Sequence, residues 1–87
     1  MKFFGRLMKE RFVIHETIAE DFETHKPLVD RLEKCLRIVC KDFDISVPIW
    51  LDRNTKEFAC FRRTTFTAEQ FIDHVKFDRL QIEVNLD

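Results

Sequence analysis

The chain has 87 residues, 45% of them hydrophobic and 36% charged, and a formal net charge of −1. This size allows one domain with its own packed core, and the balanced charge argues against a generic nucleic-acid binder, which needs an excess of Lys and Arg. No apolar stretch approaches the roughly 20 residues that span a bilayer, so we expect a cytoplasmic protein without a membrane segment.

The first twenty residues predict a β-hairpin. The stretches 2–8 and 11–19 are rich in aromatic and β-branched residues, and the second alternates with a period of two. The turn at Lys9 and Glu10 lacks the Asn-Gly or Gly residues that tight hairpin turns prefer. The turn type and the strand register therefore stay open.

Residues 27–43 carry the strongest pattern in the chain and predict an amphipathic helix. The apolar residues recur every three or four positions and share one face. They are Leu28, Val29, Leu32, Cys35, Leu36, Val39, Cys40 and Phe43. Thr24 is a candidate cap, and Pro27 fits the first turn, where backbone N–H groups have no helical partner. Ile38 lies off the buried face and has no role in this interpretation.

The segment 45–51, ISVPIWL, predicts an irregular edge strand. Its aliphatic residues alternate onto one side, and Pro48 and Trp50 fall on the other. A proline inside a strand pattern indicates an edge, because it cannot donate to the ladder. Residues 52–57 then read as a turn, and 58–66 are ambiguous between strand and helix.

The C-terminal part predicts a short helix and a strand. Thr67 and Gln70 fit a capping box, in which each side chain satisfies a backbone N–H of the other residue, so a helix is expected from there to about residue 75. In the last ten residues apolar and polar positions alternate. The pattern places Leu80, Ile82, Val84 and Leu86 inward.

These elements predict an α+β fold in which one helix covers one face of a small mixed sheet. The element order resembles the β-grasp, or ubiquitin-like, fold, which implies a last strand parallel to the first. The chain ends in VNLD and lacks the glycine-ended tail by which ubiquitin-like modifiers are conjugated. Modifier chemistry is therefore not implied.

A narrower resemblance comes from the second half of the chain. The stretch Pro-Ile-Trp-Leu-Asp, a Thr-Phe pair and a final Phe-Asp-x-Leu-x-Ile-x-Val strand are similar to a family of short bacterial proteins without assigned function. The resemblance covers the first half only loosely, and it implies no activity.

The residues that could act in catalysis or bind a metal are not spaced in the sequence as known catalytic or metal-binding motifs are. Three histidines and three cysteines are present, but Cys35 and Cys40 lie about 140° apart around the predicted helix and cannot hold one ion together. Acidic pairs such as Glu20 with Asp21, or Asp42 with Asp44, are expected to be solvated. We therefore predict a non-enzymatic protein without cofactor, metal or small-molecule substrate.

The sequence leaves two binding hypotheses. The first is a homodimer or protein partner at the edge strand 45–51, through Pro48 and Trp50. Against it, Trp50 would instead cover the open end of the core. The second is nucleic-acid binding by basic residues with interleaved aromatics, in the stretch 53–66. Its candidate residues are Arg53, Lys56, Arg62 and Arg63.

Overall fold

The computed structural model describes residues 1–86 and shows an α+β fold with two α-helices and a four-stranded sheet. The first half consists of β1 (Lys2–Lys9), β2 (Phe12–Glu20) and α1 (Leu28–Asp42). The second half consists of α2 (Asp52–Phe61), β3 (Arg63–Thr67), the 3₁₀ turn η1 (Ala68–Gln70) and β4 (Arg79–Asn85). Within residues 1–86, no helix is long and apolar enough to cross a membrane.

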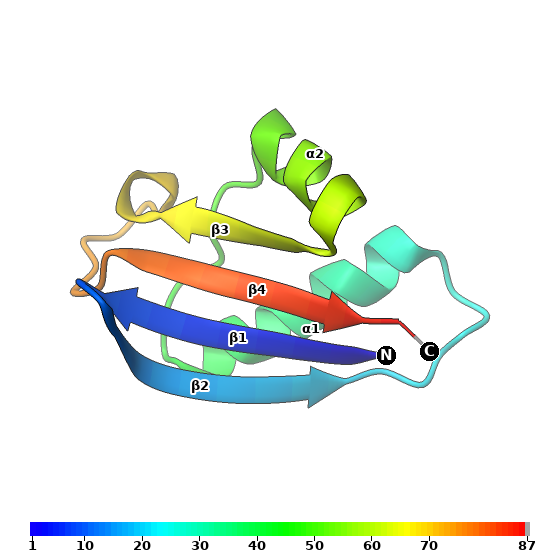
Figure 1. The fold of residues 1–87 in the computed structure, drawn as a ribbon. Helices are drawn as coiled ribbons and strands as arrows, with labels where there is room; N and C mark the ends of the chain where they lie inside the picture. Colours follow the sequence, from blue (N-terminus) through cyan, green and yellow to red (C-terminus); the bar gives the residue numbers. More distant parts are fainter. Residues whose placement is uncertain (87) are drawn as a thin grey trace.

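The strand order is β2-β1-β4-β3, and every neighbouring pair is antiparallel (Figure 1). The predicted mixed sheet is therefore wrong, because no neighbouring strands are parallel, and the β-grasp order is not confirmed, because it implies a last strand parallel to the first. Between the first helix and the last strand, the sequence predicted one strand, residues 45–51, followed by a short helix. The structure has α2 and β3 there, which run in opposite directions, so the chain enters β4 from the other end.

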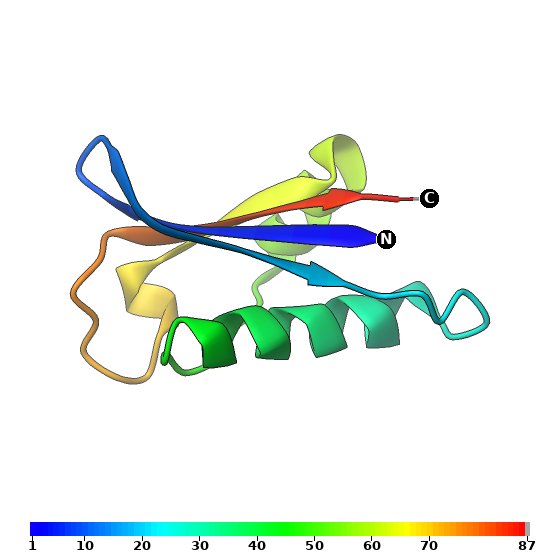
Figure 2. The ribbon, with the colours of Figure 1, turned by 90° about the horizontal axis from the view of Figure 1, so that it is seen from below.

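The core lies between one face of the sheet and α1 (Figure 2). The predicted alternation in the last strand is confirmed for Leu80, Ile82 and Val84, which are all buried, while Leu86 lies past the strand and is exposed. Helix α1 begins directly after Pro27, and Thr24 does not cap it. The first turn extends beyond the tip of β2, so Leu28 and Val29 are exposed although their spacing placed them on the buried face.

Strand β1 lies close to α1 at Gly5. A Cβ atom at this position would lie 2.5 Å from Cγ1 of Val39, a fully buried residue on α1. Since Val39 is β-branched and has little freedom to move aside, only glycine fits without a shift of the helix. Gly5 therefore sets the distance between α1 and the sheet.

The hairpin turn is formed by Glu10 and Arg11, one residue later than predicted. Glu10 adopts a positive φ of 57° without being glycine or asparagine. Its backbone N–H donates to the carboxylate of Asp78, in the loop that precedes β4. This hydrogen bond fixes a turn conformation that a glutamate does not favour by itself.

A β-bulge interrupts β2 near its start. Leu7 pairs with His15, whereas the next residue, Met8, pairs with Val13, so Ile14 is an extra residue on β2. Bulges of this kind bend a strand and end regular pairing locally. The regular part of β2 therefore runs from His15 to its C-terminal end.

The predicted edge strand at 45–51 is absent, and this segment is an irregular connection between α1 and α2. The residues 52–57, predicted as a turn, form the first part of α2, and the ambiguous stretch resolves into the rest of α2 followed by β3. The predicted helix from Thr67 to about residue 75 is limited to η1. Its capping interaction is present, since Oε1 of Gln70 accepts the N–H of Thr67 at 3.0 Å.

Candidate interaction surface

Trp50 lies against the core. Its ring centroid is 5.4 Å from that of Phe66 and 6.3 Å from that of Phe58, and its Nε1–H donates to the hydroxyl of Thr55 at 2.7 Å. The side chain is still 38% exposed. Pro48 is buried. The two residues predicted to contact a partner thus pack mainly inward.

The two sides predicted for 45–51 are present from Val47 to Leu51, although the segment is not a strand, while Ile45 packs against the core. Pro48 and Trp50 point toward the core, whereas Val47, Ile49 and Leu51 are exposed. Every residue from 47 to 51 is apolar, so the period of two did not reveal which set is buried. The inward set is the one that can reach the aromatic rings of the core.

The four basic residues do not form one cluster. Arg53 donates to Gln70 from the first turn of α2, and Lys56 is exposed one turn later. At the other end of the helix, Arg62 donates to the carbonyl of Ala59 at 2.9 Å, and the guanidinium of Arg63 lies 5.9 Å from the Phe61 ring. Of the interleaved aromatics, Phe58 and Phe66 are buried, which leaves Phe61 exposed.

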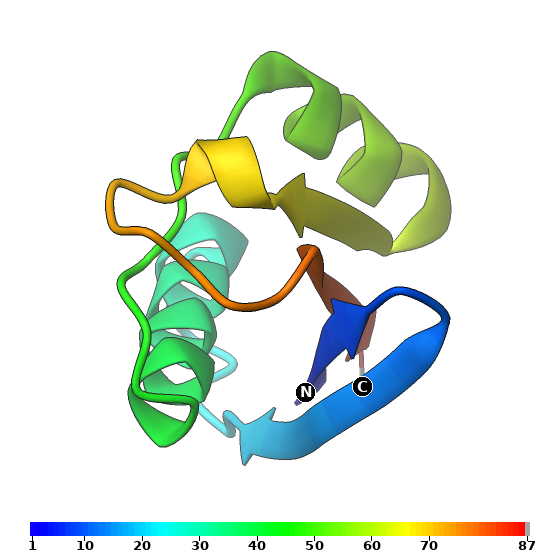
Figure 3. The ribbon, with the colours of Figure 1, turned by 90° about the vertical axis from the view of Figure 1, so that its left-hand side faces the viewer.

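The β3 edge of the sheet is covered by α2 (Figure 3). Asn54 on α2 is fully buried, and its amide donates to the hydroxyl of Thr64 at 2.7 Å and to the backbone carbonyl of Thr65 at 3.0 Å. Its carbonyl oxygen accepts from the N–H of Leu51 at 2.9 Å and from the Gln70 amide at 3.0 Å. One side chain thereby caps α2, ties it to β3 and satisfies an edge carbonyl.

The β2 edge is bare. Among the described residues, the backbone of β2 forms hydrogen bonds only with β1, and no helix or loop lies along its outer side (Figure 1). Large apolar side chains are exposed on it, with Ile18 at 55% and Phe12 at 68%. Val13 and Ile14 are exposed as well. Exposed apolar strand edges are templates for pairing with another chain.

The β2 edge was missed by the sequence reasoning, although a signal was present. The strand combines three β-branched aliphatic residues with a phenylalanine, and these occupy both faces instead of one. A strand at the edge of a sheet tolerates this pattern, because neither of its faces needs to be completely covered. The presence of Pro48 instead led to the prediction of an edge strand at 45–51, which the structure does not contain.

The C-terminal end of β2 is attached to α1 by a buried ion pair. Nε of Arg31 lies 3.2 Å from the Asp21 carboxylate, which also accepts the backbone N–H of Glu23 at 2.8 Å. The Glu23 hydrogen bond, and after it Arg31, lower the pKa of Asp21 below its ordinary value, although burial acts in the opposite direction. The expectation that Asp21 is solvated is therefore wrong, and the carboxylate fixes β2 to the helix.

Comparison of the chain with protein-family models, curated proteins and solved structures finds no match. The resemblance to a bacterial family around Pro-Ile-Trp-Leu-Asp therefore stays a prediction.

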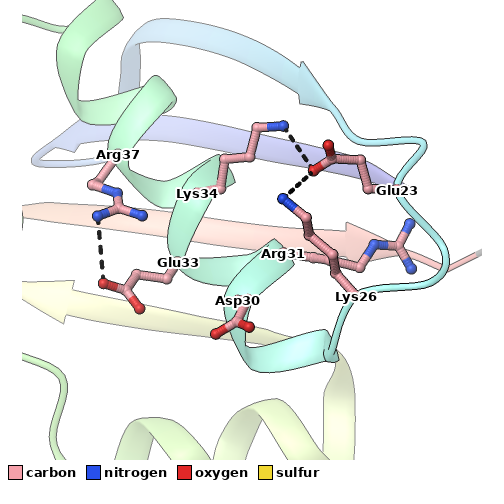
Figure 4. Close-up of a pocket in the computed structure, with 7 residues that line it drawn as sticks. All are labelled: Glu23, Lys26, Asp30, Arg31, Glu33, Lys34 and Arg37. Atoms are coloured by element: carbon pink, nitrogen blue, oxygen red, sulfur yellow. Dashed lines mark hydrogen bonds and ion pairs between the residues drawn. The ribbon is translucent and has the colours of Figure 1, made fainter.

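Two hollows on the surface of the described residues contain charged side chains of both signs. The first, of about 360 Å³, is lined by charged side chains of α1 and the preceding loop (Figure 4). Most of these charges are paired within the chain: Glu23 holds Lys26 and Lys34 at 3.2 Å each, and Arg37 lies 3.6 Å from Glu33. A second, open hollow of about 520 Å³ beside the C-terminal end of α1 mixes basic and acidic residues in the same way.

The thiols are mostly inaccessible. Burial raises the pKa of the Cys40 thiol to about 12 and also raises that of Cys35, so neither forms the reactive thiolate at neutral pH. Cys60 is exposed on α2. Within the described residues, no group of three His, Cys, Asp or Glu side chains is placed to hold a metal ion. The strongest candidate for function is thus the β2 edge.

Proposed function

We propose that the protein is a non-enzymatic interaction module that binds a strand of a protein partner at the outer edge of β2. The observation that supports this most directly is the difference between the two edges of the sheet. α2 covers β3 and hydrogen bonds to its backbone, whereas β2 is bare and carries exposed apolar side chains.

Strand addition suits this edge chemically. The added strand gains backbone hydrogen bonds from β2, and its side chains can contact exposed residues such as Ile18. Next to Ile18, the guanidinium of Arg6 on β1 lies 3.6 Å from Glu16 and 3.6 Å from Glu83, so one cation is shared by two carboxylates. An incoming strand therefore meets exposed apolar side chains with carboxylates beside them, and its own charges must suit those carboxylates.

The test is site-specific photo-crosslinking in cells. A benzophenone amino acid at position 18 is compared with the same group at position 56, which is exposed on α2 at the covered side. We expect protein adducts from position 18 and few from position 56. Equal yields at both positions, or no adduct from position 18, would contradict the proposal.

Nucleic-acid binding is the alternative, and the exposed pair of Arg63 and Phe61 is the observation that favours it. A base stacked on Phe61 would lie next to a guanidinium. A titration with a labelled single-stranded RNA at increasing salt tests this alternative. A steep salt dependence that Phe61→Ala removes supports it, and no binding at low salt eliminates it.

A further inference from the structure

We propose that the strand added to β2 is β2 of a second copy of this chain, antiparallel and centred on Thr17. This inference rests on the proposed function, and it names the partner. Two copies would then form one continuous eight-stranded sheet, with both α1 helices on the same face, because the two-fold axis is perpendicular to the sheet.

The charged residues of β2 determine which residue can lie at the two-fold axis of the dimer. Like charges directly opposite each other on paired strands are destabilising. A dimer centred on Glu16 places this carboxylate opposite its own copy, and one centred on Ile18 places Glu16 opposite Glu20 of the other chain. A dimer centred on Thr17 places Glu16 opposite Ile18, so no like charges face each other.

The bulge argues against a centre on His15. A dimer centred there would place the bulge at Ile14 inside the new ladder, opposite Glu16 of the second chain. The Thr17 centre pairs His15 with Ala19 of the second chain, and the ladder between these residues uses only the regular part of β2.

Helix α1 supplies a second contact beneath the same edge. Asp42 accepts a hydrogen bond from Thr17 on β2 at 2.9 Å, and Arg31 binds Asp21 at the end of β2. Ile38 lies within about 40° of both Arg31 and Asp42 around the helix. Ile38 is therefore on the β2 side of α1, and it is 37% exposed. Its position off the buried face, unexplained by the sequence, follows from this geometry.

A second copy of the chain covers both the β2 edge with Ile18 and the Ile38 side chain of α1, whereas a single extended peptide would cover only the strand edge. α1 packs beneath β1 and β2, and neighbouring strands are about 4.8 Å apart, so two α1 helices related across the seam would lie about 10 Å apart. This separation is close to that of packed helices. Ile38 from each copy then closes the seam below the sheet, while Ile18 contacts the second strand above it.

The first experiment measures molar mass against concentration by light scattering after size exclusion. We expect a mass approaching twice the 10.6 kDa of the chain. Ile18→Lys and Ile38→Lys, on opposite faces of the seam, should each weaken the dimer by about ten-fold or more. Val29→Lys, which is 70% exposed elsewhere on α1, is the matched control and should leave the mass unchanged.

The second experiment tests the register in a nearly unchanged chain. With the exposed Cys60 replaced by serine, Thr17→Cys should form an intermolecular disulfide on mild oxidation, because the two residues face each other at the axis. Glu20→Cys, far from the axis, should not.

A mass of one chain at every concentration would overturn the second-copy assignment. Adducts with other proteins from position 18 would in that case leave the proposed function standing. A dimer that both lysine variants leave intact, or one that Thr17→Cys fails to crosslink, would equally overturn the assignment.

Discussion

The two edges of the sheet differ in how their backbone groups are satisfied. At β3, Asn54 of α2 donates to the Thr65 carbonyl, and the helix packs along the strand. At β2, the outer backbone has no partner within residues 1–86, and the exposed side chains include Ile18. Proteins commonly cover, charge or twist away their sheet edges. This chain covers one edge and leaves most of the other bare, and this difference is the basis of the proposed binding at β2.

Among the substitutions that test the difference between the two edges, removal of the Asn54 side chain should lower the free energy of unfolding most. Asn54→Ala leaves the Gln70 amide and the Leu51 N–H without their buried acceptor, and it frees the Thr65 carbonyl. We expect a loss of about 2–4 kcal/mol in the free energy of unfolding. The matched control is Asn85→Ala at the exposed end of β4, which should change stability by less than about 0.5 kcal/mol. Urea unfolding followed by Trp fluorescence measures both, and equal effects would show that the covered edge does not depend on Asn54.

Gly5→Ala tests the half of the molecule that carries the bare edge. The new methyl group clashes with Val39, so α1 must shift away from β1, at a cost of about 1–3 kcal/mol. Val39→Ala makes room, and the double variant should therefore be less destabilised than the sum of the two single variants. Strictly additive effects in thermal unfolding would contradict the close contact.

The Asp21–Arg31 pair predicts a pH dependence at the β2 end. Because the pKa of Asp21 is lower in the folded chain than in the unfolded chain, its contribution is fully present above the unfolded value, near pH 4. The contribution is lost as the pH falls through the lower folded value. Urea midpoints measured from pH 7 to pH 2.5 should fall more steeply for the native chain than for Asp21→Asn. Identical pH profiles would show that the pair does not stabilise the fold.

The smallest effects are expected at Glu10 and Arg62, two of the three described residues with positive φ, which lie beside the edge strands β2 and β3. Glu10→Gly should stabilise the fold by about 0.5–1 kcal/mol, since its hydrogen bond to Asp78 comes from the backbone and is kept. Arg62→Gly should gain less, because it also loses the side-chain hydrogen bond to the Ala59 carbonyl. Denaturant titration distinguishes the two, and a larger gain at Arg62 would contradict this ranking.

Periodicity predicted those parts of the fold in which one side of an element is apolar and the other polar. The final strand, with Leu80, Ile82 and Val84 inward, and the helix between Pro27 and Phe43 are of this kind. Helix α2 was missed because only Phe58 and Asn54 of its ten residues are buried. A buried asparagine in the sequence DRNTKE looks like a turn residue, since its stabilising contacts come from β3 and η1.

The candidate binding surface was harder to predict than the fold. Pro48 and Trp50 were chosen because a proline inside a strand pattern indicates an edge strand, yet their side chains pack mainly inward and the segment forms no strand. Which strand lies at an edge depends on pairing between strands that are far apart in the sequence. Here β4 pairs antiparallel with β1 and leaves β2 at the edge. The sequence of β2 shows only that the strand has apolar residues on both faces, and this does not by itself place the strand at an edge.

Amide hydrogen exchange at low and high protein concentration tests the central claim most directly. The account predicts that the outward-pointing amides of β2 between Ile14 and Glu20, which do not donate to β1, become more protected as concentration rises, while the amides of β3 are protected equally at both concentrations. Protection of these outward amides that is high already in dilute solution, or that rises equally along β3, would contradict the assignment of β2 as the binding edge.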